Sequence, residues 1–217
     1  MKYDTILFDL DGTLTDSGEG ILNSVTYALE KMEMEVPKQS ELFPFIGPPL
    51  KESFIKKFEL TEKDADKAVQ YYREYFREKG LFENVVYEGV QELLETLRDK
   101  GCQLYVATSK PEEFARKILD YFDLSGYFKE IYGASMDSSR TKKADVIHYA
   151  LENGMIERKR ALMIGDREHD ILGAEENGLP GLGVLYGYGD AEELMKAGTI
   201  YLAKTPLKIY EWLSQAE

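Results

Sequence analysis

The hydrophobic and polar positions along the chain follow three different patterns. Residues 3–8 form a short apolar, partly β-branched run that stops at Asp9, which predicts a buried strand entering a loop. From residue 20 to 79 the apolar residues recur at helical spacing, and no strand pattern interrupts them. Only the proline-bearing connector at 37–49 breaks this segment, so the segment predicts a set of helices.

After residue 82 the chain alternates between helical patterns and short apolar runs. Pro111 as an early helical residue and Gly178 just past a helix end support two of the boundaries. Strands separated by helices need crossover connections, so this alternation predicts a parallel sheet. The predicted elements are helices at 90–100, 111–122, 143–153 and one that ends at Gly178, and strands at 103–108, 130–133, 161–165 and 183–186.

The patterns together predict an α/β fold in two parts. The first strand has no helical partner except the long helical segment that follows it, so the economical architecture is a sheet domain with a helical insertion. We expect a Rossmann-like parallel sheet core, formed by residues 1–16 and 83–217, with an inserted α-helical cap subdomain at 17–82.

Composition limits the cellular environment and the classes of binding partner that the chain is expected to have. At 217 residues and 24.8 kDa, the chain can bury a sizeable core without covalent staples. The single cysteine, Cys102, excludes an intramolecular disulfide and a cysteine-based metal site, which favours a reducing, cytoplasmic setting. The net charge of -13 repels phosphate backbones, and no apolar run approaches the roughly 20 residues of a membrane span. We therefore expect no nucleic-acid or membrane partner, and a monomer or homodimer.

Polar side chains gather where the predicted strands end. Ligands of an open parallel sheet bind beyond the carboxyl ends of its strands, so these side chains are candidates for one shared site. Carboxylates bind a hard divalent cation, typically Mg²⁺, while hydroxyl and lysine groups neutralise phosphate oxygens, and this set suits phosphoryl transfer. The candidates are Asp9, Asp11, Thr108, Ser109, Lys110, Lys142, Lys143, Asp166, Arg167 and Asp170.

Asp9 and Asp11 stand two positions apart directly after the first predicted strand. Because the chain turns there, both carboxylates can face one reaction centre. One of them can attack phosphorus while the other handles the proton of the leaving group. The plain structural alternative is that Asp11 and Gly12 form only a turn.

Several motifs resemble those of one enzyme family. They are DLDGTLTD at 9–16 with its preceding strand, Thr108 after an apolar strand, a downstream lysine, and GDREHD at 165–170 after a further apolar strand. In this order they resemble the haloacid dehalogenase superfamily of phosphohydrolases. The resemblance covers nearly the whole chain, including the helical insertion. It is greatest to the branch that holds phosphoglycolate phosphatases, small 5'-nucleotidases and β-phosphoglucomutases.

This resemblance implies a role for each motif residue. Asp9 would be the nucleophile that forms an aspartyl phosphate, and Asp11 the general acid that then serves as base for water. Thr108 would hydrogen-bond the transferring phosphoryl group. Asp166 would hold Mg²⁺ together with Asp9 and the carbonyl of Asp11, while Asp170 would ligate the metal or orient a metal-bound water.

The remaining contacts to the substrate are less closely specified by the sequence. The spacing to the residues that follow favours Lys143 as the phosphate-binding lysine, with Lys142 as the alternative. Ser109 is a further candidate for phosphate binding. In the connector, the stiff apolar stretch around Gly47 is a candidate contact to the substrate, and the alternative is that it only joins two helices.

The leading hypothesis is a Mg²⁺-dependent phosphatase that hydrolyses a small phosphomonoester, either phosphoglycolate-like or a nucleoside 5'-monophosphate. A sugar phosphomutase of the β-phosphoglucomutase type would keep both aspartates and remains an alternative. A non-catalytic phospho-ligand-binding domain or a receiver-like signalling domain is an alternative from another class, although a receiver would have about 120 residues and no helical insertion.

Overall fold

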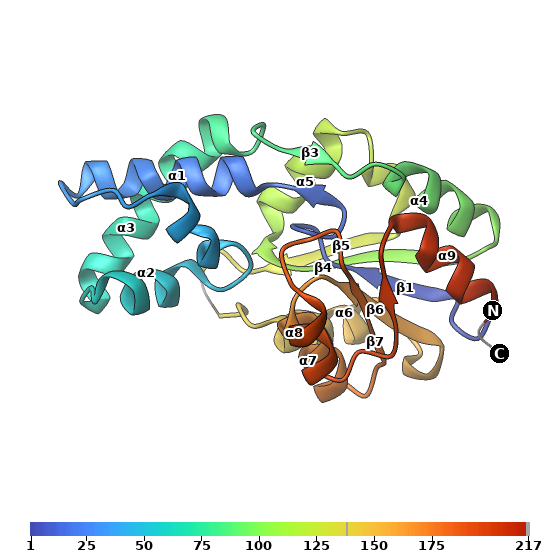
Figure 1. The fold of residues 1–217 in the computed structure, drawn as a ribbon. Coiled ribbons are helices and arrows are strands. Elements are labelled where there is room, and N and C mark those ends of the chain that lie inside the picture. The colour runs from blue at the N-terminus through green and yellow to red at the C-terminus, as the bar shows by residue number, and fades with distance from the viewer. Residues whose placement is uncertain (138, 216–217) are drawn as a thin grey trace. The chain divides into compact units, whose positions relative to one another are not determined.

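A computed structural model describes residues 1–137 and 139–215 (Figure 1). The chain divides into two compact units. The core unit consists of Met1–Thr15 and Val86–Glu217, and the helical unit of Asp16–Val85. The chain passes between them within two short strands, β2 (Thr15–Asp16) and β3 (Val85–Val86). The helical unit thus begins one residue before the predicted insertion and ends three residues after it.

The core unit is built on a six-stranded sheet in the order β5-β4-β1-β6-β7-β8 (Figure 1). Each neighbouring pair is parallel, which confirms the predicted Rossmann-like α/β fold. β1 lies between β4 and β6, where the order of connection reverses, and this is the position at which open parallel sheets bind ligands. The strands are β1 (Thr5–Phe8), β4 (Gln103–Pro111), β5 (Glu130–Ala134), β6 (Ala161–Gly165), β7 (Gly181–Val184) and β8 (Leu202–Ala203).

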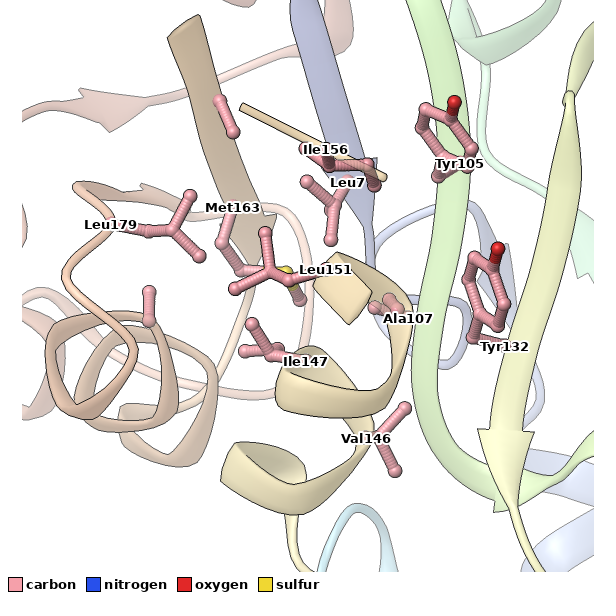
Figure 2. Packing of buried hydrophobic residues seen from close by; sticks show 13 residues of the cluster. Leu7, Tyr105, Ala107, Tyr132, Val146, Ile147, Leu151, Ile156, Met163 and Leu179 are labelled. Carbon is pink, nitrogen blue, oxygen red and sulfur yellow. The ribbon is translucent and has the colours of Figure 1, made fainter. Parts of the chain in front are cut away.

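Helices cover both faces of this sheet, with α4, α5 and α9 on one side and α6 and α7 on the other (Figure 1). All four residues of β1 are buried, as expected of a strand covered on both faces. Figure 2 shows Leu7 and Met163 of neighbouring strands packed against Ile147 and Leu151 of α6. The helices are α4 (Val90–Asp99), α5 (Glu112–Tyr121), α6 (Lys143–Asn153), α7 (Glu168–Glu176), α8 (Ala191–Lys196) and α9 (Pro206–Gln215), with short 3-10 turns η4 (Ser125–Tyr127) and η5 (Arg158–Arg160).

Some predicted boundaries are wrong in detail. The strand expected at 183–186 is β7, which begins and ends two residues earlier. Pro111 lies at the N-cap position of α5, one residue before the helix, with φ -51° and ψ 130°. Gly178 follows the end of α7 with φ +73°, so it ends the helix as predicted. After β7 the chain adds α8, β8 and α9, for which no boundaries were predicted.

The helical unit contains α1 (Gly18–Lys31), α2 (Leu50–Phe58), α3 (Glu62–Tyr75) and the π-helical turn η3 (Phe76–Gly80). The connector forms two 3-10 turns, η1 (Gln39–Glu41) and η2 (Phe43–Phe45). Thr61 caps α3 by accepting a hydrogen bond from the backbone N–H of Asp64 at 3.2 Å. Phe45 from the connector packs against Phe54 of α2, with ring centroids 4.9 Å apart, so the connector belongs to the unit's own core.

Candidate active site

The buried charged residues of the described chain all lie in the core unit. Asp9 and Asp166 directly follow β1 and β6, Lys110 lies near the end of β4, and Lys143 and Asp170 lie in the first turns of α6 and α7. Burying a charge is costly unless an opposite charge or a metal ion compensates it, so a cluster of this kind marks a specialised site. The residues are Asp9, Lys110, Lys143, Asp166 and Asp170.

Lys143, the first residue of α6, lies at the centre of this cluster. Its Nζ is 2.6 Å from Oδ1 of Asp9, 2.8 Å from Oδ1 of Asp170 and 3.0 Å from the carbonyl oxygen of Ala107. Burial alone would lower the pKa of Lys143, but the carboxylates of Asp170 and Asp9 outweigh it and raise the pKa, so the ammonium stays charged. Lys142, one residue earlier, is exposed, so of the two candidate lysines only Lys143 reaches the cluster.

Three carboxylates in the cluster are placed to share a cation. Asp9, Asp166 and Asp170 each offer an oxygen, and these oxygens lie within 4.8 Å of one another. Oδ2 of Asp166 accepts a hydrogen bond from the backbone N–H of Tyr188 at 2.8 Å, while its Oδ1 is buried without a partner in the described chain. An orphaned carboxylate oxygen beside two other carboxylates fits a hard divalent cation.

The pKa values of these carboxyl groups reflect the same crowding. Burial, followed by the negative charges of Asp170 and Asp9, raises the pKa of Asp166 well above its ordinary value. Burial also raises the pKa of Asp9, although Lys143 counteracts it. A bound cation would relieve this repulsion, because it stabilises the ionised form of every carboxylate around it.

Local structure fixes Asp170 at this site. Its Oδ2 accepts a hydrogen bond from the backbone N–H of Arg167 at 3.0 Å, three residues earlier, at the start of α7. This is one half of a capping box, because the arginine side chain at the N-cap cannot accept in return; the backbone N–H of Asp170 donates instead to the carbonyl oxygen of Arg167 at 3.0 Å. The absence of a side chain at Gly165 is also required, because a Cβ there would collide with the carboxyl group of Asp170.

Asp11 faces a different lysine. Its Oδ2 lies 2.8 Å from Nζ of Lys110, and the two side chains are only 12% and 4% exposed. The other oxygen of Asp11, Oδ1, is buried and has no partner in the described chain. Sequence analysis placed Lys110 at this end of the sheet but gave it no role, because a lysine in a loop is usually a surface residue.

Sequence analysis also did not identify the segment 187–189 as part of the site. A Cβ at Gly187 would collide with the carbonyl oxygen of Gly12 and with Asp166, so this backbone passes directly over the site. The ring of Tyr188 lies above Gly12, whose φ of +85° suits glycine. The pattern Gly-Tyr-Gly just after a strand is a usable signal, because it falls at the same sheet edge as the recognised motifs.

The other candidate residues fall in two places. Thr108 is buried at the end of β4 and accepts a hydrogen bond from the backbone N–H of Lys110 at 3.2 Å. Ser109 beside it is half-buried. Gly47 belongs to the helical unit, where it is exposed with φ +106°, and its part in substrate binding stays a prediction.

The model of the haloacid dehalogenase-like hydrolase family matches residues 6–184. The chain belongs to this family. Among relatives of this hydrolase, a 5'-nucleotidase of Pseudomonas aeruginosa is 48% identical over 194 residues, which are 89% of this chain and 88% of that protein. The tyrosine-protein kinase PtkA of Mycobacterium tuberculosis is 40% identical over 194 residues, which are 89% of this chain and 66% of the kinase.

A solved structure agrees with the assignment of this hydrolase to the family. The crystal structure of a predicted phosphatase from Clostridium acetobutylicum has a TM-score of 0.96 and 47% identity, with 100% of both chains covered. In the part of the chain that the structure describes, no helix has the length and apolarity needed to cross a membrane.

Proposed function

We propose that this enzyme hydrolyses small phosphomonoesters in two steps, by transfer of the phosphoryl group to Asp9 and then to water. Its family and the phosphatases among its relatives support a phosphoric monoester hydrolase. The observation that carries the mechanism is the buried contact of Asp9 with Lys143 at 2.6 Å inside a cluster of three carboxylates. A surface turn or a structural ion pair would not require this concentration of buried charge.

In the first step a carboxylate oxygen of Asp9 attacks phosphorus, and the bond from phosphorus to the ester oxygen breaks. Asp11 gives a proton to the departing oxygen, so the product leaves as an alcohol. In the second step water gives a proton to Asp11 and attacks the same phosphorus. The phosphorus–Asp9 bond then breaks, and inorganic phosphate and the original carboxylate are restored.

The phosphoryl oxygens need neutral or positive partners while charge moves between the attacking and leaving atoms. Lys143 would supply a positive charge that is already fixed beside Asp9. The hydroxyls of Thr108 and Ser109 lie at the end of β4 and would donate hydrogen bonds to the same oxygens. Because these groups are held by strand and helix ends, they need little rearrangement during the reaction.

The charge balance of the core site supports a divalent cation. Four carboxylates, those of Asp9, Asp11, Asp166 and Asp170, face two ammonium groups, those of Lys110 and Lys143, which leaves two negative charges. Asp9, Asp166 and Asp170, with the carbonyl of Asp11, would hold Mg²⁺. When bound, Mg²⁺ would supply positive charge to the phosphoryl oxygens and offset the repulsion between the carboxylates.

Nucleoside 5'-monophosphates are the first substrates to test, because a relative at 48% identity is named 5'-nucleotidase. Phosphoglycolate follows from the resemblance of the motifs. The experiment is a panel of these and other phosphate esters with Mg²⁺, scored by release of inorganic phosphate, together with mass spectrometry of acid-quenched enzyme to find a phosphoryl group on Asp9.

The outcomes separate the candidate functions. Release of phosphate with transient label on Asp9 is the expected result. A phosphomutase would instead pass the phosphoryl group from Asp9 to a second hydroxyl of a sugar phosphate faster than to water. Phosphate release without any label on Asp9, or with label on another residue, would overturn the proposed mechanism.

A further inference from the structure

The buried ion pair between Lys110 and Asp11 is not used by the mechanism above. Nζ of Lys110 lies 2.8 Å from Oδ2 of Asp11, and both side chains are nearly inaccessible. Lys143 already compensates Asp9 and Asp170, so the core site contains a second lysine with a separate carboxylate partner. A buried lysine of this kind is costly to desolvate and needs a reason for its position.

The local backbone is built to turn Lys110 inward. β4 pairs regularly with β5 up to Thr108, opposite Gly133, and the pairing resumes only at Pro111, opposite Ala134. The two residues between them, Ser109 and Lys110, therefore form a bulge. Bulges bend a strand and redirect side chains, and they are common beside active sites.

One hydrogen bond holds the bulge in place, and one glycine makes room for it. The backbone N–H of Lys110 donates to Oγ1 of Thr108 at 3.2 Å. Gly133 of the neighbouring strand has no side chain, and a Cβ there would lie only 2.7 Å from the carbonyl oxygen of Lys110. The same short segment therefore positions both the Thr108 hydroxyl, which is proposed to bind the phosphoryl group, and Lys110, which contacts Asp11.

The carboxylate of Asp11 depends on this lysine for its orientation. Lys110 binds Oδ2, while Oδ1 is buried with no hydrogen-bond partner in the described chain. Because Lys110 occupies Oδ2, the unpartnered Oδ1 is the oxygen left to carry the proton. General acid catalysis requires this, because the proton must be delivered within hydrogen-bond reach of the leaving oxygen.

We propose that Lys110 is a positioning residue for proton transfer to the leaving group, which acts by holding Oδ2 of Asp11 so that Oδ1 serves the ester oxygen. This inference rests on the proposed role of Asp11. Lys110 makes its contribution through Asp11, in contrast to Lys143, which faces Asp9 and would act on the phosphoryl group itself. The effect of replacing Lys110 on kcat/KM should therefore depend on how strongly the leaving group needs a proton.

The test compares kcat/KM for an alkyl phosphate, whose leaving oxygen must be protonated, with that for 4-nitrophenyl phosphate, whose leaving group departs readily as an anion. The parameter kcat/KM is used because it reports the steps up to phosphoryl transfer to Asp9 and not the later attack of water. In Lys110→Met we expect a loss of ~100-fold with the alkyl ester but below ~5-fold with the aryl ester. Lys142→Met, which removes an exposed lysine, is the matched control and should change neither value.

A double-mutant cycle with Asp11→Asn establishes whether the effect passes through Asp11. In the Asp11→Asn background, Lys110→Met should lower kcat/KM for the alkyl ester by less than ~3-fold, because the group that it positions is already gone. Lys110→Arg, which keeps the positive charge, should recover part of the selective loss. Lys110→Gln is measured in the same way and gives the answer if the Met variant does not fold, as judged by its thermal unfolding.

Equal losses for both esters would overturn the inference, and so would a full loss from Lys110→Met in the Asp11→Asn background. Either result would show that Lys110 acts on the phosphoryl group or on the fold. The variant Asp11→Asn alone separates this failure from a failure of the proposed function. If Asp11→Asn itself affects both esters equally, the general acid is wrongly assigned; if it selectively affects the alkyl ester while Lys110→Met does not, only the role of Lys110 is wrong.

Discussion

The core unit and the helical unit bury different kinds of side chain. In the core unit the buried set includes three aspartates and two lysines, all near the carboxyl ends of strands. In the helical unit the buried polar residues are uncharged, namely Ser17, Ser24 and Asn84. Its interior depends on aromatic packing, in which Phe54 is fully buried and its ring centroid lies 4.9 Å from that of Phe45.

This difference indicates that the buried charges of the core unit serve the reaction, whereas the buried aromatic rings of the helical unit serve its stability. Buried like charges lower stability unless an opposite charge or cation offsets them, whereas buried aromatic rings contribute to it directly. Variants that remove a carboxylate from the core cluster should therefore affect turnover far more than folding, and variants of the helical core should do the reverse. The predictions below test this contrast, beginning with the largest effect.

Replacing Asp9 with Asn should lower kcat by more than ~1000-fold, because the amide cannot form the acyl phosphate and is a poorer cation ligand. Folding should be retained, since the replacement removes a buried charge without changing the shape of the side chain. Steady-state kinetics and thermal unfolding with Mg²⁺ measure the two effects. Substantial phosphatase activity in this variant would contradict the nucleophile assignment.

The two adjacent lysines give a matched pair within the core unit. Lys143→Ala should lower kcat/KM by ~100-fold or more, because it removes the positive charge 2.6 Å from Asp9, and Lys142→Ala should change it by less than ~2-fold. Lys142 is exposed, so its loss should alter the free energy of unfolding by less than about 0.5 kcal/mol. Kinetics of both variants on one substrate check this, and equal losses would remove the special role of Lys143.

In the helical unit a matched pair of phenylalanines tests the opposite side of the contrast. Phe54→Ala should lower the free energy of unfolding by about 3–5 kcal/mol, because it leaves a cavity in the aromatic core. Phe43 is 55% exposed, and Phe43→Ala should cost less than about 0.5 kcal/mol. Denaturant unfolding, with hydrogen exchange of α2 and α3 to localise the effect, distinguishes the two variants; similar costs would show that the unit lacks a defined core.

Asp166 tests whether the charge cluster destabilises the cation-free protein. Asp166→Asn should raise the free energy of unfolding by about 1 kcal/mol in the presence of a chelator, because the repulsion from Asp170 and Asp9 is reduced. The same variant should lose activity and most of the stabilisation by Mg²⁺. Asp145→Asn, at an exposed position, is the control, and thermal unfolding with chelator and with Mg²⁺ gives both values. An equal response of Asp166→Asn and the unchanged chain to Mg²⁺ would place the cation elsewhere.

The raised pKa of Asp166 also sets the sign of a pH effect. In the cation-free protein the folded state keeps a proton on Asp166 at pH values where the unfolded chain has lost it. The free energy of unfolding contributed by this group therefore falls as the pH rises from the ordinary carboxyl range through the raised pKa. Since Mg²⁺ binds the ionised carboxylate, its stabilising effect should grow over the same range, and thermal unfolding at several pH values measures it. A Mg²⁺ effect that shrinks with rising pH would contradict the assignment.

The central part of this arrangement could be predicted from sequence because local signals were dense there. Asp9 directly follows a buried strand, which places its carboxylate beyond the carboxyl end of that strand, and a second such strand beside it does the same for Asp166. Lys143 was favoured by its position relative to the apolar residues of its helix. The structure shows that only this lysine reaches Asp9, since Lys142 is exposed.

Other features depend on tertiary structure that the sequence pattern does not reveal. Lys110 is turned inward by a bulge, and a bulge appears only when the pairing of β4 with β5 is known. The backbone N–H of Tyr188 donates to Oδ2 of Asp166, and the two residues are 22 positions apart in the chain. The end of β7 was predicted two residues late, so the loop that follows was not recognised as part of the site.

The smallest expected effect concerns Gly47, whose proposed contact to the substrate is the one site prediction outside the core unit. If the connector recognises the ester group, Gly47→Val should raise KM for the best substrate by about 5-fold, while 4-nitrophenyl phosphate is hydrolysed nearly as before. The backbone φ of +106° makes any side chain at this position strained, so a loss of stability is also expected.

A control for this strain separates recognition from folding. Gly101 has φ +81° and open space around its missing side chain, so Gly101→Val introduces similar backbone strain in the core unit at a position with no assigned contact to the substrate. Both variants are compared by thermal unfolding and by KM for the large and the minimal substrate. A rise in KM confined to Gly47→Val and to the large substrate would support recognition by the connector, because strain alone should act alike in both variants. Equal changes for the two substrates, or the same change in Gly101→Val, would make Gly47 purely structural, so that substrate recognition would have to come from residues other than Gly47.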